Sequence, residues 1–134
     1  YVLSDDKGLL QKDAVCALVQ GSYWGNTRSR EAIEKSLETS LCYGAYENGV
    51  QCAFSRVVTD FAVMFWLCDV LVDEGHRGRG LGKGLVEMVL DTPVLAGLTG
   101  VLATRDAHGL YARYGFLRDT EGRFMRRRPP EFSR

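Results

Sequence analysis

The chain has 134 residues, which is enough for one domain that buries roughly two thirds of its unfolded surface without disulfides or metals. Its 17 Lys and Arg residues balance its 17 Asp and Glu residues, so no global field draws it to nucleic acid or to a membrane surface. We therefore expect a single domain over residues 1–134, with neither nucleic acid nor membrane as a partner.

The N-terminal part predicts one short strand and two helices. Residues 1–4 are expected to form the strand. Residues 13–20 and 29–37 carry apolar side chains at helical spacing, and each segment begins after polar residues that suit a helix start.

The middle of the chain predicts a β-hairpin followed by a long strand. Residues 47–50, Glu-Asn-Gly-Val, favour a tight turn because Asn-Gly tolerates the positive φ values of a type I′ turn. Residues 41–46 and 51–58 should then pair antiparallel. Thr59-Asp60 marks the next turn, into an apolar strand that ends at Val72. A strand that is apolar on both faces belongs inside a sheet covered by helices on each side.

The remaining elements are predicted from breaks in the apolar pattern. Pro93 interrupts the chain after a helix. We expect a helix over 82–91, a strand over 99–104, a short helix over 106–113, and two last strands over 115–118 and 123–128. The three arginines at 126–128 are interpreted as charges on an edge strand, which discourage association between sheets.

The most informative segment is the glycine-rich turn of residues 77–82, Arg-Gly-Arg-Gly-Leu-Gly, which joins the long strand to the next helix. Such a turn can bind phosphate, because several N–H groups converge on one anion and the helix dipole favours negative charge. Arg77 and Arg79 add charge-assisted donors. The P-loop pattern fails because Lys83 is followed by Gly84, and the dinucleotide pattern fails because its sixth position is not glycine.

Two motifs give the chain a resemblance to a known family. Arg77-x-x-Gly80-x-Gly82 resembles the pyrophosphate loop of the GNAT superfamily of N-acyltransferases. Residues 107–116 are similar to the family's A-x-x-x-Tyr-x-x-x-Gly-Phe element, and both motifs occur in the family's order and spacing over residues 41–128. The resemblance implies an α/β GNAT fold: a mixed, mostly antiparallel central sheet with helices on both faces and a cleft for acyl-CoA between two splayed strands.

The resemblance implies acetyl-CoA as cosubstrate. Main-chain groups of the strand before the turn would align the pantetheine arm and place an N–H near the thioester oxygen. Many family members have asparagine at the position of Thr104, whose hydroxyl can still bond the pantetheine arm. The implied cofactor contacts are Val70, Leu71, Val72, Arg77, Gly78, Arg79, Gly80, Leu81, Gly82, Lys83, Thr104 and Tyr111.

Acyl transfer from a thioester to an amine needs a neutral amine, a polarised carbonyl and a proton for the leaving thiolate. Tyr111 matches the family's tyrosine acid, and ring packing is the alternative. Asp69 interrupts an apolar strand, where it would face the acceptor amine as base; an ion pair with an arginine such as Arg56 is the alternative. His108 shares a helix face with Tyr111 and is a second candidate base, unless it is simply solvated.

The acceptor site is expected to be lined by aromatic residues and by Asp69. Tyr23, Trp24 and Phe61 are the candidate substrate contacts, with packing in the core as their alternative. The predicted function is acetyl transfer from acetyl-CoA to a primary amine of a small molecule or peptide, by direct attack in a ternary complex. The alternative is a non-catalytic acyl-CoA-binding sensor or interaction module. The identity of the acceptor, and whether the protein is a monomer or a homodimer, stay open.

The four cysteines indicate a reducing compartment. They lie within apolar patterns without C-x-x-C spacing, so we interpret them as buried, reduced thiols rather than zinc ligands or disulfides. No apolar run reaches the roughly 18 residues of a membrane span, and no signal peptide opens the chain. The prediction is a cytoplasmic protein without a metal. Because the chain starts at Tyr1 rather than Met, the sequence leaves open whether residues precede it.

Overall fold

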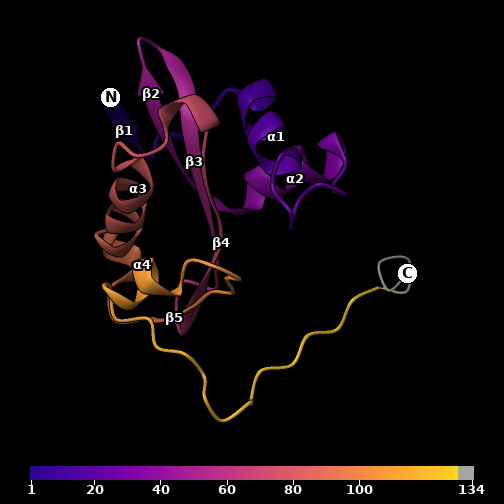
Figure 1. Cartoon of the computed structure of the whole chain (residues 1–134), viewed down its shortest axis with the longest axis vertical. Coiled ribbons are helices and arrows are strands. Elements are labelled where there is room, and N and C mark those ends of the chain that lie inside the picture. Colours follow the sequence, from indigo (N-terminus) through magenta and orange to yellow (C-terminus); the bar gives the residue numbers. More distant parts are fainter. Residues whose placement is uncertain (130–134) are drawn as a thin grey trace. The chain divides into compact units, whose positions relative to one another are not determined.

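The computed structural model describes residues 1–129. The chain forms two compact units, and the boundary between them falls between residues 103 and 104. The first unit contains a five-stranded sheet with the order β1-β2-β3-β4-β5 (Figure 1). Neighbouring strands are antiparallel except β4 and β5, which are parallel, so the expected mixed and mostly antiparallel sheet is confirmed. The strands are β1 (Val2–Ser4), β2 (Leu41–Glu47), β3 (Val50–Thr59), β4 (Met64–Val72) and β5 (Thr99–Val101).

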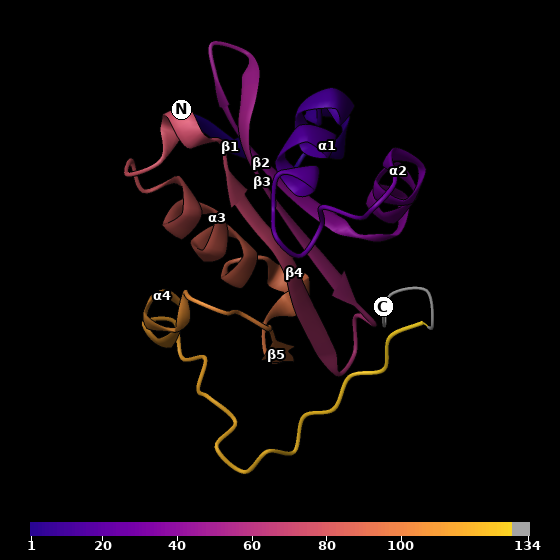
Figure 2. The same ribbon diagram turned by 45° about the vertical axis from the view of Figure 1, so that its right-hand side comes forward.

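Helices cover both faces of this sheet, as predicted. The α-helices of the first unit are α1 (Lys12–Gln20), α2 (Arg30–Thr39) and α3 (Leu81–Leu90), with short 3-10 helices at Lys7–Leu9, Glu74–His76 and Pro93–Leu95. α1 packs on β3 and β4, whereas α3 packs on β2, β3 and β4. Figure 2 shows α1 and α2 on one side of the sheet and α3 on the other.

The core between α1, α2 and the sheet is apolar and closely packed. It consists of Val15, Cys16, Val19, Ile33, Leu37, Cys42 and Phe54. Leu71 of β4 packs against this cluster, which places one face of β4 toward α1 and α2. The start of α2 is fixed by Ser29, whose hydroxyl accepts a 3.1 Å hydrogen bond from the backbone N–H of Ala32, as a helix N-cap does.

Two turns set the path of the sheet. Asn48 and Gly49 have φ values of 52° and 79°, so the predicted hairpin between β2 and β3 is confirmed. The turn between β3 and β4 is organised by Asp60, whose Oδ1 accepts hydrogen bonds from three consecutive backbone N–H groups, those of Ala62, Val63 and Met64. These bonds lower the pKa of the Asp60 carboxyl, because they stabilise its charged form.

The pairing of β4 with β5 is short. β5 pairs only with Met64–Trp66, while β4 continues to Val72. Within the described part of the chain, residues 67–72 of β4 therefore have no strand neighbour on the β5 side. This is the splayed opening that the resemblance implied, and it makes β5 shorter than the strand expected over 99–104.

The described part of the second unit, residues 104–129, contains one short helix, α4 (His108–Ala112). The strands predicted over 115–118 and 123–128 are wrong: the structure has no strand between residue 113 and residue 129, and the arginines at 126–128 are not part of an edge strand. Asp119 explains part of this result, because its carboxylate accepts from the N–H groups of Glu121 and Arg123 and so holds the backbone in a local turn. Residues 130–134 of the expected domain lie outside the described residues.

The cysteines are free thiols. Cys16, Cys42 and Cys52 are buried and Cys68 is half-buried, and burial raises the pKa of all four. Across residues 1–129, no helix combines the length and the apolar character needed to cross a membrane.

Candidate active site

The glycine-rich turn leads directly into α3. Gly78 and Gly80 have φ values of 79° and 78°, and a Cβ atom on either would meet nothing within 4 Å, so the left-handed backbone rather than crowding calls for glycine. Gly80 is the N-cap of α3 and provides no side-chain cap. Within residues 1–129, the backbone N–H groups of residues 78–83 have no hydrogen-bond acceptor. Consecutive free N–H groups at a helix N-terminus are able to bind an anion.

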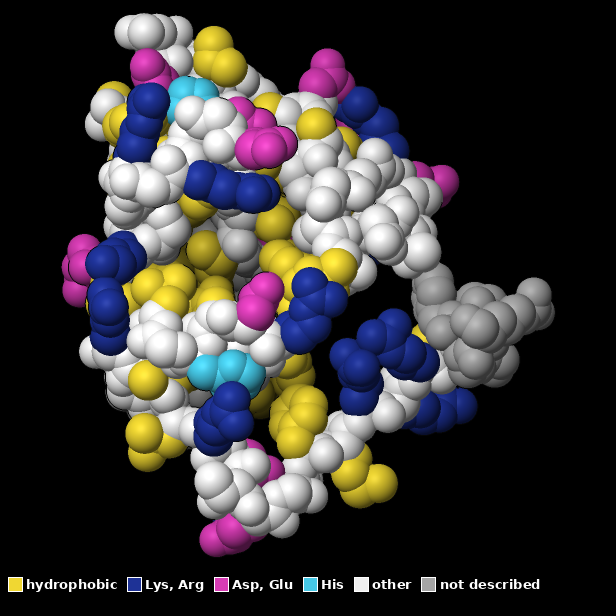
Figure 3. All heavy atoms as spheres, in the orientation of Figure 1, with side chains coloured by type: hydrophobic (Ala, Val, Ile, Leu, Met, Phe, Trp, Pro, Cys, Tyr) yellow, Lys and Arg dark blue, Asp and Glu magenta, His cyan; other side chains and the backbone are white. Residues whose placement is uncertain are grey.

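The basic side chains of the turn lie at the surface. Arg77 Nε donates to the carbonyl oxygen of Val72 at 3.3 Å and so ties the turn to the end of β4. Arg79 Nη1 donates to the Tyr1 hydroxyl at 2.6 Å and lies 3.9 Å from Glu47 Oε2. Lys83 is exposed. Figure 3 shows Lys and Arg side chains at several separate places on one face, with Asp and Glu side chains among them, rather than as one continuous basic surface.

The end of β4 brings the other predicted cofactor contacts next to the turn. Val72 faces α3, since a Cβ atom on Gly82 would lie 3.9 Å from Val72 Cγ2, while Leu71 faces the core under α1 and α2. Val70 to Val72 belong to the part of β4 that, among residues 1–129, has no strand neighbour on the β5 side. As far as residues 1–129 show, the part of β4 without a neighbour on the β5 side is thus followed along the chain by the glycine-rich turn.

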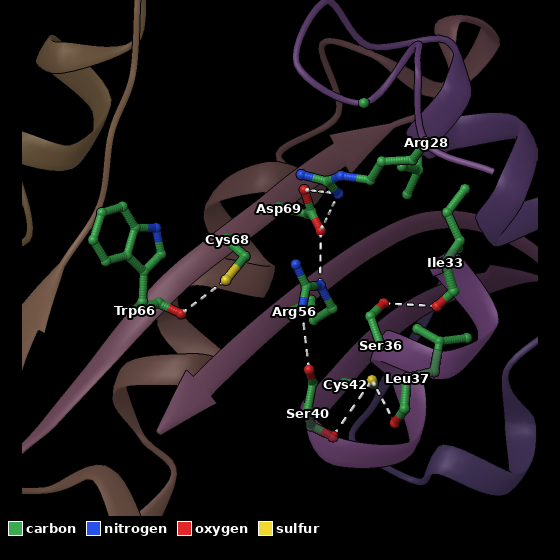
Figure 4. Close-up of polar contacts among 12 residues, drawn as sticks. Arg28, Ile33, Ser36, Leu37, Ser40, Cys42, Arg56, Trp66, Cys68 and Asp69 are labelled. Atoms are coloured by element: carbon green, nitrogen blue, oxygen red, sulfur yellow. Dashed lines mark hydrogen bonds and ion pairs between the residues drawn. The ribbon is translucent and has the colours of Figure 1, made fainter. Parts of the chain in front are cut away.

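Asp69 lies at the centre of a polar cluster below the α1–α2 loop. Its side chain is 1% exposed and accepts from Trp24 Nε1 at 2.7 Å and from Arg56 Nε at 2.9 Å. Arg28 Nη1 lies 3.3 Å from one carboxylate oxygen and 3.4 Å from the other. Figure 4 shows Arg28 and Arg56 approaching Asp69 from opposite sides. The ion pair with Arg56, which the sequence left as an alternative, is therefore present.

Arg56 extends the cluster toward the end of α2. Its Nη1 donates to the Ser40 hydroxyl at 3.1 Å, and its side chain is largely buried. Arg56 pairs with Asp69 across β3 and β4, beside an irregularity in the strand register. Asp69 and Arg56 together join the sheet to the loop before α2 and to the C-terminal end of α2. Burial raises the pKa of the neighbouring Cys68 thiol, and the positive charge of Arg56 opposes that shift.

Arg28 is a site residue that the sequence did not reveal. The loop carrying it is fixed by two hydrogen bonds, from Arg28 N–H to Gly25 O at 3.1 Å and from Gln20 Nε2 to Arg28 O at 3.0 Å. The guanidinium bonds Asp69 through Nη1 alone, and within residues 1–129 its Nε and Nη2 have no partner. The only available signal was an arginine shortly after Tyr23-Trp24, and nothing local ties it to a residue 41 positions away.

The predicted aromatic contacts separate into two groups. Tyr23 and Trp24 lie edge to face with ring centroids 4.9 Å apart, and Trp24 bonds Asp69. Phe61, by contrast, occupies the turn before β4 with φ of 62°, and Asp69 lies about 17 Å along the strand from its first residue at 3.4 Å per residue. Trp24 and Asp69 form one site, whereas Phe61 lies at the opposite end of β4.

The second unit carries the tyrosine motif. The hydroxyl of Thr104 accepts a 3.0 Å hydrogen bond from the N–H of Ala107, just before α4. His108 is the first residue of α4, and Tyr111 lies near its end, with its ring edge to face with that of Phe116 at 6.1 Å. Gly115 follows with φ of 87°, so the expected order of short helix and glycine stop is present.

Comparison with known proteins fits this geometry. The family model of the acetyltransferase (GNAT) domain matches residues 38–118, which include β4, the glycine-rich turn and α4. The chain belongs to the GNAT acetyltransferase family. A GNAT-family protein of Xanthomonas campestris pv. campestris, known from a crystal structure, is 37% identical, with a TM-score of 0.91 over 98% of this chain and 94% of that chain. This match confirms the GNAT fold.

Curated relatives match only part of their own length. A Gibberella zeae protein assigned to the acetyltransferases is 27% identical over 109 residues, 66% of this chain and 62% of that protein. The histone acetyltransferase TAP1 of Glycine max is 34% identical over 70 residues, 51% of this chain and 30% of that protein. The chain thus spans less than two thirds of either relative. Among residues 1–129 there is no group of three or more His, Cys, Asp or Glu side chains that could hold a metal ion.

Proposed function

We propose that this GNAT protein transfers the acetyl group of acetyl-CoA to a primary amine. The observation that carries the proposal is the run of N–H groups at residues 78–83 without acceptors, which starts α3 directly beyond the open edge of β4. The turn suits the pyrophosphate of the cofactor, and an unpaired strand edge suits the amide-rich pantetheine arm, which can align like an added strand. Family membership makes acetyl-CoA the expected donor.

The chemistry follows from direct attack. The amine nitrogen forms a bond to the thioester carbonyl carbon, the carbon–sulfur bond breaks, and the sulfur leaves as a thiolate. A backbone N–H from Val70 to Val72 would stabilise the negative charge that develops on the carbonyl oxygen. Tyr111 would donate its phenolic proton to the thiolate, and a base would accept a proton from the amine nitrogen.

The contacts of Asp69 bear on which group acts as the base that accepts the proton of the amine. Both of its oxygens already accept hydrogen bonds, from Trp24, Arg28 and Arg56. We infer that Asp69 positions these side chains, and that water removes the amine proton. The sequence-based hypothesis that Asp69 itself is the base stays a prediction, as does the second candidate, His108.

The experiment is an initial-rate assay of CoA thiol release with a library of primary amines. Direct attack in a ternary complex predicts amine-dependent release, with intersecting lines in double-reciprocal plots. Parallel lines would indicate an acetyl-enzyme intermediate instead. Binding of acetyl-CoA without release in the presence of any amine would favour the alternative, a non-catalytic acyl-CoA sensor.

A further inference from the structure

The charges around Asp69 do not cancel. Two guanidinium groups, those of Arg28 and Arg56, surround a single carboxylate, so the cluster carries a net positive charge. An ammonium group brought to this place would meet that positive charge, whereas a carboxylate would be attracted. The net positive charge therefore disfavours a cationic group of the acceptor next to Asp69.

The two arginines differ in what they can offer a ligand. Arg56 is 13% exposed and bonds both Asp69 and Ser40. Arg28 is 34% exposed, its contacts with Asp69 are long at 3.3 and 3.4 Å, and its Nε and Nη2 have no partner among residues 1–129. A planar guanidinium with two unused donors is well suited to binding a carboxylate through two parallel hydrogen bonds.

Arg28 lies near the part of β4 that is proposed to hold the pantetheine arm. Asp69 directly precedes Val70, the first of the three β4 residues proposed to hold the pantetheine arm, and its side chain points to the α1–α2 face. Arg28 lies over that carboxylate, and the exposed ring of Trp24 hydrogen-bonds the same group. A ligand that reached the thioester from this face would meet Arg28 and Trp24 beside the open edge of β4.

We propose that Arg28 binds a carboxylate of the acceptor, so that the acceptor is an amine with a carboxylate close to it, as in an amino acid. This inference rests on the proposed function and names its substrate class. Asp69 then acts as a positioning residue: it holds the Arg28 guanidinium and the Trp24 ring in place, and it reduces the repulsion between Arg28 and Arg56.

The test compares wild type with Arg28→Gln, using L-amino acids and the matching carboxamides as acceptors. The ratio of kcat/KM for carboxylate over carboxamide should fall about 10- to 100-fold in the variant, the range for a lost charge-assisted hydrogen bond. Because the amines of the two acceptors differ in pKa, the ratio is compared between proteins rather than read in wild type alone. Arg30→Gln is the matched control. This substitution changes the net charge by the same amount, but Arg30 pairs with Asp13 and Glu34 rather than with Asp69.

A binding measurement separates the two proposals. N-acetyl-L-phenylalanine and its carboxamide, which resemble reaction products, are titrated calorimetrically in the presence of CoA. Amine acetylation with the same carboxylate-to-carboxamide ratio in wild type and Arg28→Gln would overturn the Arg28 inference and leave the proposed function intact. Carboxylate binding that depends on Arg28, without any acetylation, would overturn the proposed function and would still support carboxylate binding by Arg28. Neither acetylation nor Arg28-dependent binding would overturn both.

Discussion

At the scale of single residues, Tyr111 is the side chain whose role is easiest to isolate. Tyr111→Phe removes the phenolic proton and keeps the ring that lies against Phe116. If Tyr111 protonates the leaving thiolate, kcat should fall by about 10²-fold or more while the affinity for acetyl-CoA changes little. Steady-state kinetics and calorimetry measure the two quantities. Tyr114→Phe, three residues further on, is the control, and equal turnover in wild type and Tyr111→Phe would assign Tyr111 to packing.

Asp69 is expected to act through its neighbours. Asp69→Asn keeps the size of the side chain but leaves two guanidinium groups without their counter-charge, so we expect a loss of about 3 kcal/mol in the free energy of unfolding. The shape of the pH–rate profile should stay that of wild type. Denaturant unfolding and kinetics on the same preparation check both, with the exposed Asp91→Asn as control. Undiminished stability together with a rate that drops most below the pKa of the amine would instead make Asp69 the base.

Local sequence patterns predict only some of the contacts in the site. An aspartate inside an apolar strand signals either function or a buried ion pair, and Arg56 was one possible partner. The structure shows Arg56 opposite Asp69 on the neighbouring strand. Trp24 and Arg28 bond the same carboxylate from a loop more than 40 residues away. No local spacing encodes that contact.

At the scale of elements, the turn between β4 and α3 should determine cofactor binding. Gly80→Asp adds a negative charge where a phosphate is proposed to bind, so affinity for acetyl-CoA should fall below detection by calorimetry. Gly97→Asp is a matched control, because Gly97 also has a positive φ, of 80°, and open space around its Cα. Both variants carry the same backbone strain and the same charge. Wild-type affinity in a folded Gly80→Asp protein would remove the phosphate-loop assignment.

Elements differed in how well local patterns predicted them. The Asn-Gly hairpin and the apolar β4 strand formed as expected, because turn chemistry and a continuous apolar run act over neighbouring residues. The predicted strands at 115–118 and 123–128 did not form. A strand needs a partner for its backbone groups, and around Asp119 the backbone bonds a side chain within the same segment instead.

For the whole molecule, the small size of the second unit bears on whether the two units unfold together. The described part of the second unit, residues 104–129, has one helix of five residues and is too small to bury a core of its own. We therefore predict a single domain: one calorimetric transition for the chain under reducing conditions, and no helical circular dichroism for an isolated peptide of residues 104–134. Two resolved transitions, or a folded peptide, would contradict this expectation.

Local patterns predicted the order of most helices and strands, and two motifs carried the resemblance to the GNAT family. The order of elements follows from backbone requirements and apolar periodicity, which short segments encode: glycines at positive φ before a helix, and a glycine stop after a short one. The hydrogen-bond partners of the Asp69 carboxylate, in contrast, could not be predicted from local patterns. Its partners come from a loop and a neighbouring strand, and a buried charge bonds whichever donors the fold brings within reach.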